Sequence, residues 1–306
     1  MICQKKKSVF VFCYSIGIYA LLWMAQPAVS AKQVLTSTSL SSLSAGHSLH
    51  LQPGVVTNTI PAVAADTLTL YGTVFLMGCY NPVTDEMEQH LVNQRLLPQT
   101  DPYGLNTIPH RSANNRSVVD WIKIELRDKN DPDILVSERA AFLSPSGALL
   151  DTNYNQGVRF TGLADDVFFI RISHRNHLAV RTPIPVAFSR GVAHYNFSSG
   201  QKQVFNHAGV TSNGPMKELR PGRWGLWAGN ANGDQLIRYT GPQNDENILV
   251  NTCLTGNISS VIQPVYSNCD FNMNGVVRYN GPQNDEVILL SRVLEGNNSA
   301  IYQEHR

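Results

Sequence analysis

Two stretches near the C-terminus carry the same pattern of residues, and this repeat constrains the fold more than any other feature. Residues 230–246 and 270–286 align without a gap, at an offset of 270 − 230 = 40 residues. Each copy begins with oxygen-bearing side chains at alternate positions and ends on an Asp that precedes an apolar run. A short loop that wraps a hard cation and then enters a helix has this pattern.

The second copy carries the clearer set of candidate ligands. Gly275 stands at the sixth loop position, where a sharp turn is needed, but the twelfth position is Gly281 instead of the usual carboxylate. We expect the loop to close four residues later, on Asp285. The predicted calcium ligands are the side chains of Asp270, Asn272, Asn274 and Asp285 and the main-chain carbonyl of Val276.

The first copy offers a weaker set, because Asn replaces Asp at its first position and Gln235 replaces Gly at its sixth. Its predicted ligands are the side chains of Asn230, Asn232, Asp234 and Asp245 and the main-chain carbonyl of Leu236. With two carboxylates per loop, we expect two structural calcium ions bound in the weak extracellular range, roughly 0.1–1 mM. The alternative is that these residues only form tight turns, with the closing aspartates as helix caps.

The apolar residues after each loop predict a short helix, expected over 286–294 in the second copy and capped by Asp285. A single helix of this length does not persist alone. The two helices present the same apolar positions: Ile248, Leu249 and Leu254 match Ile288, Leu289 and Leu294. We therefore expect the two repeats to pack on each other, with the loop residues Ile237 and Val277 in the same small core.

The N-terminus predicts export. Residues 1–31 have the basic start, the apolar run and the small residues of a secretory signal peptide, and a single membrane anchor is the alternative. Residues 32–66 are rich in Ser, Thr, Val and Ala, which predicts a linker or a disordered segment. We expect no membrane span once the signal is removed.

Three cysteines remain after removal of the signal peptide, and an exported chain permits a disulfide. Cys253 and Cys269 flank the connection between the repeats, so they are the natural pair, and Cys79 is then the odd thiol. The alternative is that all three are small buried hydrophobic side chains.

Short alternating segments separated by turn signals predict strands over residues 67–188, which favours a β-sandwich. Residues 85–97 are expected to add a short helix between strands. Residues 189–222 are rich in Gly, Ser and Asn and are interpreted as a hairpin or irregular connector before the repeats at 223–306. On strand 117–127 the apolar residues alternate with charged ones, so Asp120, Glu125 and Asp128 are interpreted as its solvated face.

Three further stretches, residues 118–128, 171–178 and 298–305, are similar to segments of many exported proteins of Bacteroidetes-type bacteria. The duplicated loop resembles the calcium loops of dockerin modules, in which a helix follows the loop but none precedes it. In those exported proteins a β-sandwich-like unit precedes this tandem module, often at the end of large surface or adhesin-like polypeptides. The resemblance implies a mainly β chain, with an Ig-like β-sandwich followed by a small α-helical dockerin-like module, and it implies little about activity.

Other constellations are weaker. His174 and His177 could ligate zinc, but no third ligand has suitable spacing, and a structural role is favoured. Trp224 and Trp227 could stack on sugars, although covering the joint between the two parts is the favoured role. The chain has no nucleophile elbow, zinc-protease motif or phosphate-binding glycine loop. With a formal net charge of +1 and no basic stripe, it shows no sign of nucleic-acid binding.

These observations predict a secreted or cell-surface protein without enzymatic activity, acting in adhesion or extracellular assembly. Its expected partner is a protein or a glycan on the cell surface. The alternatives are an accessory carbohydrate-binding protein and an extracellular hydrolase whose site the sequence does not reveal. Glycan binding without turnover would select the first alternative, and hydrolysis that depends on one carboxylate would select the second.

Overall fold

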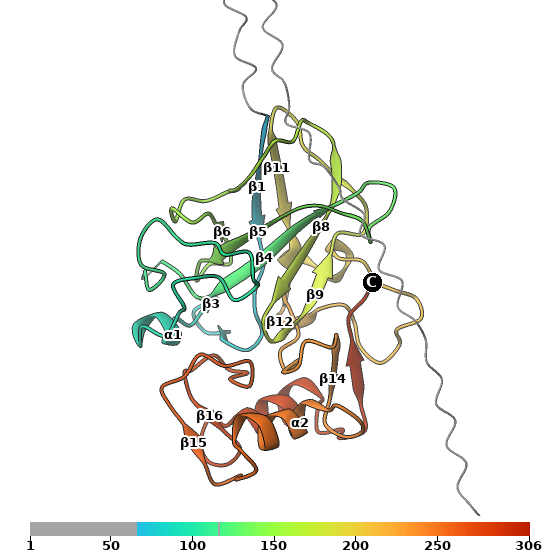
Figure 1. Ribbon diagram of the computed structural model, residues 1–306. Coiled ribbons are helices and arrows are strands. Elements are labelled where there is room, and N and C mark those ends of the chain that lie inside the picture. The colour runs from blue at the N-terminus through green and yellow to red at the C-terminus, as the bar shows by residue number, and fades with distance from the viewer. Residues whose placement is uncertain (1–65, 116) are drawn as a thin grey trace, which may run out of the picture. The chain divides into compact units, whose positions relative to one another are not determined.

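The computed structural model describes residues 66–115 and 117–306, and within them the chain is mainly β (Figure 1). The predicted signal peptide 1–31 and nearly all of the predicted linker 32–66 lie outside the described residues. Below, residues 66–222 are called the sheet region and residues 223–306 the repeat region. Among the described residues, no helix is long and apolar enough to cross a membrane.

Two sheets make up most of the sheet region. In the three-stranded sheet the central strand pairs in parallel with one neighbour and antiparallel with the other, in the order β11 (Val192–Asn196), β1 (Thr67–Thr73) and β7 (Val158–Thr161). The six-stranded sheet has the order β10 (Val186–Ala187), β8 (Val167–His174), β4 (Trp121–Arg127), β5 (Leu135–Leu143) and β6 (Leu149–Leu150), and β9 (His177–Arg181) also pairs with β8. Both sheets contribute side chains to one hydrophobic core.

Period-two alternation explains the strands. Along β8 every second residue is buried, among them Ile170 and Ile172, and these side chains fill the shared core. On β4 the expected apolar face is buried, but the opposite face is not solvated as the sequence suggested. Glu125 is 2% exposed, because Lys123 and Arg127 on its own strand and Arg171 on β8 fold over its carboxylate.

The connector prediction for residues 189–222 is wrong in part. Val192–Asn196 forms β11, which pairs in parallel with β1, and Phe197 is fully buried in the core of the sheet region. The expected boundary at residue 223 falls at the turn of a hairpin between β12 (Lys217–Arg220) and β13 (Arg223–Gly225). A parallel pairing joins strands that are distant in sequence, so local composition does not reveal it.

The helix expected over residues 85–97 is reduced to one turn. The remaining short elements of the sheet region are β2 (Tyr80–Asn81), β3 (Glu86–Met87), α1 (His90–Asn93), η1 (Phe197–Ser199) and η2 (Gln201–Gln203). Leu91 in this turn and Leu97 after it are buried in the core, so the apolar positions were correct although the helix was too long.

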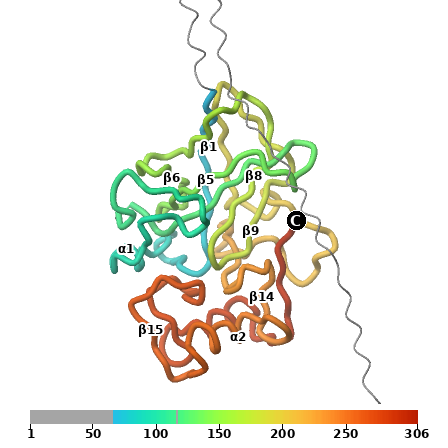
Figure 2. The backbone as a smooth tube through the Cα atoms, in the orientation of Figure 1, coloured from blue at the N-terminus to red at the C-terminus, as the bar shows by residue number. Residues whose placement is uncertain are grey.

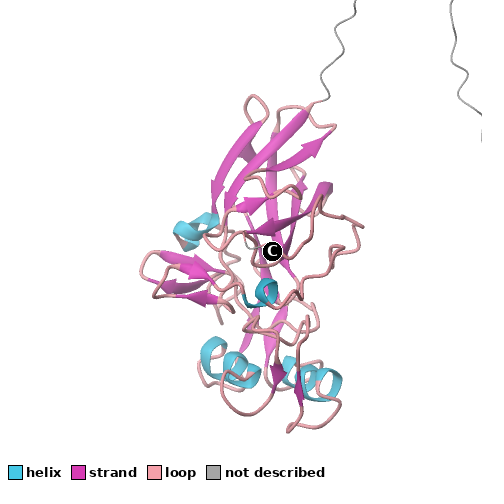
Figure 3. Ribbon diagram, turned by 90° about the vertical axis from the view of Figure 1, so that its left-hand side faces the viewer, coloured by secondary structure: helices cyan, strands magenta, loops and turns pink. Residues whose placement is uncertain are grey.

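Two short helices follow the two loops of the repeat region (Figure 3). Each starts as an α-helix and widens into π-helical turns: α2 (Asp245–Asn247) with η3 (Ile248–Cys253), and α3 (Asp285–Val287) with η4 (Ile288–Val293). The caps are Asn244 and Asn284, whose side chains accept from the main-chain N–H three residues on, at 2.7 and 2.8 Å. The expectation that Asp285 caps the helix is therefore wrong by one residue.

The two repeats exchange strands with each other. β14 (Leu236–Arg238) of the first loop pairs with β17 (Ile301–Gln303), which follows the second helix. β16 (Val277–Arg278) of the second loop pairs with β15 (Val261–Ile262), which follows the first helix. The registers Ile237↔Tyr302 and Val277↔Ile262 are related by the repeat offset, since 277 − 237 = 302 − 262 = 40. Ile237, Val277 and both helices share one core, as the repeat pattern predicts.

A disulfide joins Cys253 and Cys269, the pair favoured by the sequence, and Cys79 is a buried free thiol. The bridge ties the end of the first helix to the residue before the second loop.

The sheet and repeat regions lie next to each other (Figure 2), and contacts join them. Isolated bridges pair Leu76 with Leu226 and His177 with Ala228. Met77 of the sheet region lies in the core of the repeats, while Met273 of the second loop lies in the core of the sheets. All described residues belong to one compact unit.

Candidate functional site

The closing aspartate of the second loop turns back onto the start of that loop. The carboxylate of Asp285 accepts from the main-chain N–H of Phe271 at 2.8 Å and of Arg278 at 3.0 Å, and the side chain is fully buried. Because an asparagine caps the helix, both oxygens of Asp285 are directed to the loop. The structure thus brings Asp285 beside Asp270, the first predicted ligand.

The other predicted ligands of the second loop turn their oxygens onto loop amides. The carboxylate of Asp270 accepts from the N–H groups of Asn274 and Gly275, at 3.0 and 2.8 Å. The side-chain oxygens of Asn272 and Asn274 accept from the N–H two residues on, at 3.0 and 2.9 Å. Gly275 has a φ of +80°, the left-handed turn for which glycine was expected. Each side-chain oxygen keeps a second lone pair.

The two acidic groups of this loop are buried together. Burial raises the pKa of Asp285 well above its usual value, and the neighbouring charge of Asp270 raises it further. Burial raises the pKa of Asp270 to about 6, although Arg175 acts in the opposite direction. Within the described residues neither carboxylate forms an ion pair with a Lys, Arg or His side chain. A bound cation would offset the cost of charging this pair.

The first loop repeats the same geometry. Asp245 is fully buried and accepts from the N–H groups of Ala231 and Arg238, at 2.7 and 2.9 Å. Burial raises its pKa to about 7. The side-chain oxygens of the other predicted ligands accept from loop amides at 2.9–3.0 Å: Asn230 from Gly233, Asn232 from Asp234, and Asp234 from Leu236.

Two features distinguish the first loop from the second. Arg238 forms an ion pair with Asp234, so one of its carboxylates already has a cationic partner. Gln235, which replaces the glycine, adopts a left-handed φ of +73°, and its side-chain oxygen is buried without a hydrogen-bond partner among the described residues. The chain thus accommodates a non-glycine residue at this turn at the expense of an unsatisfied polar atom.

The donor set suits calcium better than a softer metal. Within the described residues, no group of three or more His, Cys, Asp and Glu side chains is placed to hold a metal ion. Each loop offers two carboxylates, and its other candidate donors are amide and carbonyl oxygens. Calcium accepts such all-oxygen sets, whereas zinc prefers nitrogen and sulfur ligands.

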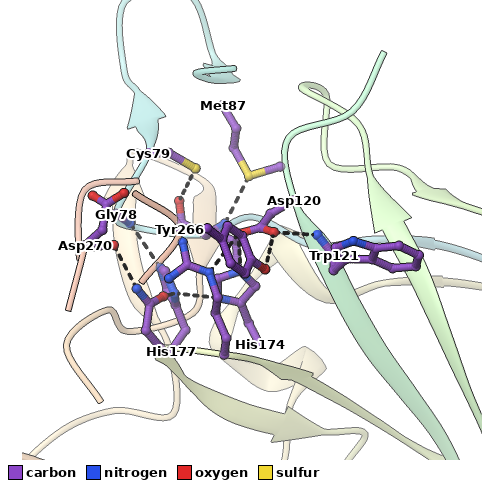
Figure 4. A network of polar contacts seen from close by, with 12 residues as sticks. Gly78, Cys79, Met87, Asp120, Trp121, His174, His177, Tyr266 and Asp270 are labelled. Carbon is purple, nitrogen blue, oxygen red and sulfur yellow. Dashed lines mark hydrogen bonds and ion pairs between the residues drawn. The ribbon is translucent and has the colours of Figure 1, made fainter. Parts of the chain in front are cut away.

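A buried polar network lies under the loops (Figure 4). Asp120, predicted to be solvated, is fully buried and accepts four hydrogen bonds. The donors are the main-chain N–H of Trp121 at 2.7 Å, the hydroxyl of Tyr266 at 2.8 Å, Nε of Arg175 at 3.1 Å and Nε2 of His174 at 3.2 Å. Burial alone would raise the pKa of Asp120, but the positive charge of Arg175 and the bond from His174 lower it. The half-buried Asp128 lies outside this network.

The two histidines carry one consistent proton arrangement. The N–H of Gly78 donates to Nε2 of His177 at 3.2 Å, so the proton of His177 is on Nδ1, 2.8 Å from the side-chain oxygen of Asn176. Nδ1 of His174 lies 3.0 Å from Nδ1 of His177 and accepts, which leaves Nε2–H of His174 to donate to Asp120. Burial lowers the pKa of both rings. Since these nitrogens are engaged, the contacts match the structural role that the sequence favoured over zinc binding.

The turn between β8 and β9 contacts the beginning of both loops. The carbonyl of Asn176 accepts from the N–H groups of Gly229 and Asn230, at 3.0 and 3.1 Å, and its side chain donates to the carbonyl of Asp270 at 2.8 Å. Arg175 donates to the carbonyl of Ser267. Stretches 118–128 and 171–178, marked in the sequence by a resemblance, by the alternating strand and by the histidine pair, supply Asp120, His174, Arg175, Asn176 and His177 to this network.

The two tryptophans lie on either side of the joint. Trp227 is 5% exposed in the repeat core, and its Nε1–H donates to the carbonyl of Gly214 at 2.9 Å. Trp224 is half-buried against the core of the sheets. The covering role is therefore the one that the contacts match, and Trp227 has little surface left for a sugar. No family model, no curated protein and no solved structure matches this chain.

Proposed function

We propose that the chain is a secreted or cell-surface protein without enzymatic activity, in which an Ig-like β-sandwich carries a dockerin-like module that binds two structural calcium ions. The observation that supports this most is the second loop. Asp270 and Asp285 are buried together, have no cationic side chain paired with them, and are surrounded by further oxygen donors. We propose a role in adhesion or extracellular assembly, where calcium is abundant.

Calcium would act here as a staple and not as a signal. The ligands close loops whose first residues contact Asn176, so an ion in each loop would hold the joint between the two regions. With two carboxylates per loop, the expected affinity is in the range of roughly 0.1–1 mM, which is suited to permanent occupancy outside the cell.

The first experiment measures calcium binding by the chain without residues 1–31. Isothermal calorimetry should show two sites, and 10 mM calcium should raise the midpoint of thermal unfolding relative to a chelator. At the expected affinities the stabilisation is about 1.4–2.7 kcal/mol per occupied site. Magnesium at the same concentration serves as the control and should stabilise less, because it prefers a smaller octahedral site. An unchanged unfolding midpoint in calcium would refute the proposal.

The second experiment tests export. The full chain with a C-terminal epitope tag should be found outside the inner membrane, and removal of residues 1–31 should retain it in the cytoplasm. Equal distribution of both proteins between the fractions would show that this segment does not direct export.

A further inference from the structure

The outward face of the three-stranded sheet carries an aromatic pair. Tyr71 on β1 and His194 on β11 are direct partners in the parallel register, and their rings stack with centroids 4.9 Å apart and planes at 12°. Both side chains are exposed, whereas their neighbours Leu70 and Ala193 are buried. The two rings therefore form one stacked pair on the side of the sheet away from the core.

Gly157 fixes the position of the Tyr71 ring. A Cβ atom on Gly157, whose φ is +93°, would lie 2.8 Å from the ring of Tyr71 and 2.9 Å from the side chain of Thr69. Only glycine leaves room for the tyrosine ring to lie against the main chain at this point. With His194 beside it, the ring is held in place before any ligand arrives, which lowers the entropic cost of binding.

A hollow of about 450 Å³ opens beside the aromatic pair. It is also lined by Thr73, Gln156 and Asn196, and none of its lining residues is Asp, Glu, Lys or Arg. Within the described residues, the hydroxyl of Tyr71, the amide of Gln156 and the ring nitrogens of His194 make no hydrogen bond to another part of the chain. The hollow thus combines an exposed, stacked aromatic pair with uncharged donors and acceptors, although the Oδ1 of Asn196 already accepts from the N–H and hydroxyl of Ser198.

We propose that this hollow binds a neutral glycan. One face of a pyranose ring presents C–H groups with partial positive charge, which fit the negative face of an aromatic ring, and its edge presents hydroxyl groups. The sugar would pack against the exposed side of the stacked Tyr71–His194 pair, and its hydroxyls would bond to Gln156, Thr73 or the side-chain NH₂ of Asn196. An apolar ligand would leave these polar groups unpaired, and an anionic one would find no cation in the hollow.

The inference names a partner class for the extracellular role proposed above, and it does not rest on calcium. The hollow belongs to the sheet region and shares no residue with the two loops. Glycan binding should therefore persist in a chelator at temperatures where the chain stays folded. A failure to bind calcium and a failure to bind a glycan can therefore be distinguished, and each bears on a different proposal.

The test uses the chain without residues 1–31 on an array of neutral oligosaccharides made of glucose, galactose, mannose or N-acetylglucosamine, with sulfated and sialylated glycans on the same array. At least one neutral series should bind. Tyr71→Ala should weaken that binding about tenfold, Tyr71→Phe should leave it within about threefold, and Gln156→Ala should weaken it severalfold. Circular dichroism and the unfolding midpoint of each variant control for folding.

Three results would overturn the proposal: no binding to any neutral glycan, binding confined to the charged glycans, or binding that Tyr71→Ala does not change. If Tyr71→Ala fails to fold, the comparison of Gln156→Ala with the unchanged chain decides, because Gln156 is exposed and its side chain makes no hydrogen bond within the described residues.

Discussion

The two loops of the repeat region share a sequence pattern, a closing aspartate and an asparagine cap, but they neutralise their acidic side chains differently. In the first loop Asp234 is paired with Arg238, so the chain itself supplies a cation. In the second loop position five is an asparagine, and the acidic residue at position one, Asp270, is buried beside Asp285. The first loop is partly compensated by an ion pair, whereas within the described residues the carboxylates of the second loop form none, although the positive charge of Arg175 acts on Asp270.

The loops also differ in their surroundings. The fourth position of the first loop is Gly233, which is exposed and where a Cβ would meet nothing within 4 Å, whereas the fourth position of the second loop is Met273, which is fully buried in the core of the sheets. Gln94 also donates to the carbonyl of Asn274 at 2.7 Å. The first residues of both loops contact Asn176 at the joint, but the middle of the first loop is exposed, whereas the middle of the second packs against the sheet region. We infer that the stability of the whole chain depends more on the second loop.

The largest expected effect comes from removing the closing carboxylates. Asp285→Ala and Asp245→Ala each leave two main-chain N–H groups without acceptors, at a cost of about 1–3 kcal/mol per buried group. Asp285→Ala should cost more and should abolish most of the calcium-dependent stabilisation, because the second loop also holds the joint. Urea unfolding of both variants, with calcium and with chelator, measures this difference. A larger loss for Asp245→Ala would contradict the ranking.

A second prediction tests the joint without touching a ligand. A Cβ on Gly78 would lie 2.0 Å from the carbonyl oxygen of Phe271, so Gly78→Ala should force the second loop away from the sheets. Overpacking of this kind costs about 1–3 kcal/mol. The matched control is Gly200→Ala, since Gly200 has an extended backbone and no atom within 4 Å of an added Cβ. Calorimetry should show weaker calcium binding at one site only, and equal weakening at both would disprove the difference in surroundings.

Local residue spacing was enough to predict where the loops lie. Packing between residues that are distant in sequence could not be predicted. The spacing of Asp270, Asn272 and Asn274 is read within one short loop, and the pairing of the two apolar helix faces follows from the 40-residue repeat. The disulfide followed from cysteines that flank one connection. By contrast, the choice between Asn284 and Asp285 as helix cap depends on where each side chain turns, and the two residues are adjacent.

Alternation assigned residues to the faces of β4 but did not reveal what covers each face. Glu125 is buried by basic side chains from β4 and from β8, and Asp120 by residues that stand 54 to 146 positions away along the chain. The parallel partner of β1 was missed for the same reason, because β11 follows more than a hundred residues later. Long-range burial of polar groups leaves no periodic signal in the sequence.

The third prediction compares how the stability of the two loops depends on pH. The pKa values of His174 and His177 are lowered by burial, so at these two groups the unfolded chain binds more protons below about pH 6.5, and their contribution to stability is lost as the pH drops through that value. Each unit of lowering contributes about 1.4 kcal/mol. The raised pKa values of Asp245, Asp270 and Asp285 act in the opposite direction, so the contribution of the histidines is measured as the difference between the unchanged chain and a histidine variant. The network reaches the second repeat through Tyr266 and Asn176, so hydrogen exchange at pH 5.5 should quicken at Gly275 more than at Gly233.

The matched control for this prediction is His90→Gln, because His90 is exposed and lies outside the network. That variant should keep the full pH dependence, whereas His177→Gln should reduce it. If His177→Gln changed the free energy of unfolding equally at pH 7.5 and pH 5.5, His177 would not be held neutral by burial.

The smallest effect is expected from removing Arg238, the cationic partner of Asp234 in the first loop. Arg238→Ala frees the carboxylate of Asp234 and should strengthen calcium binding at the first loop by up to about fivefold, the equivalent of an ion pair worth about 0.2–1 kcal/mol. Arg278→Ala is the matched control forty residues later, since the Arg278 guanidinium reaches only the carbonyl of Pro282 at 3.5 Å and pairs with no carboxylate within the described residues. Arg278→Ala should leave the calcium affinity of the second site within about twofold of that of the unchanged chain. Calorimetric titration of both variants gives the two affinities. If Arg238→Ala weakened the first site, its guanidinium would be holding the loop in shape and not competing with the ion, and the contrast between the loops would lie in their packing alone.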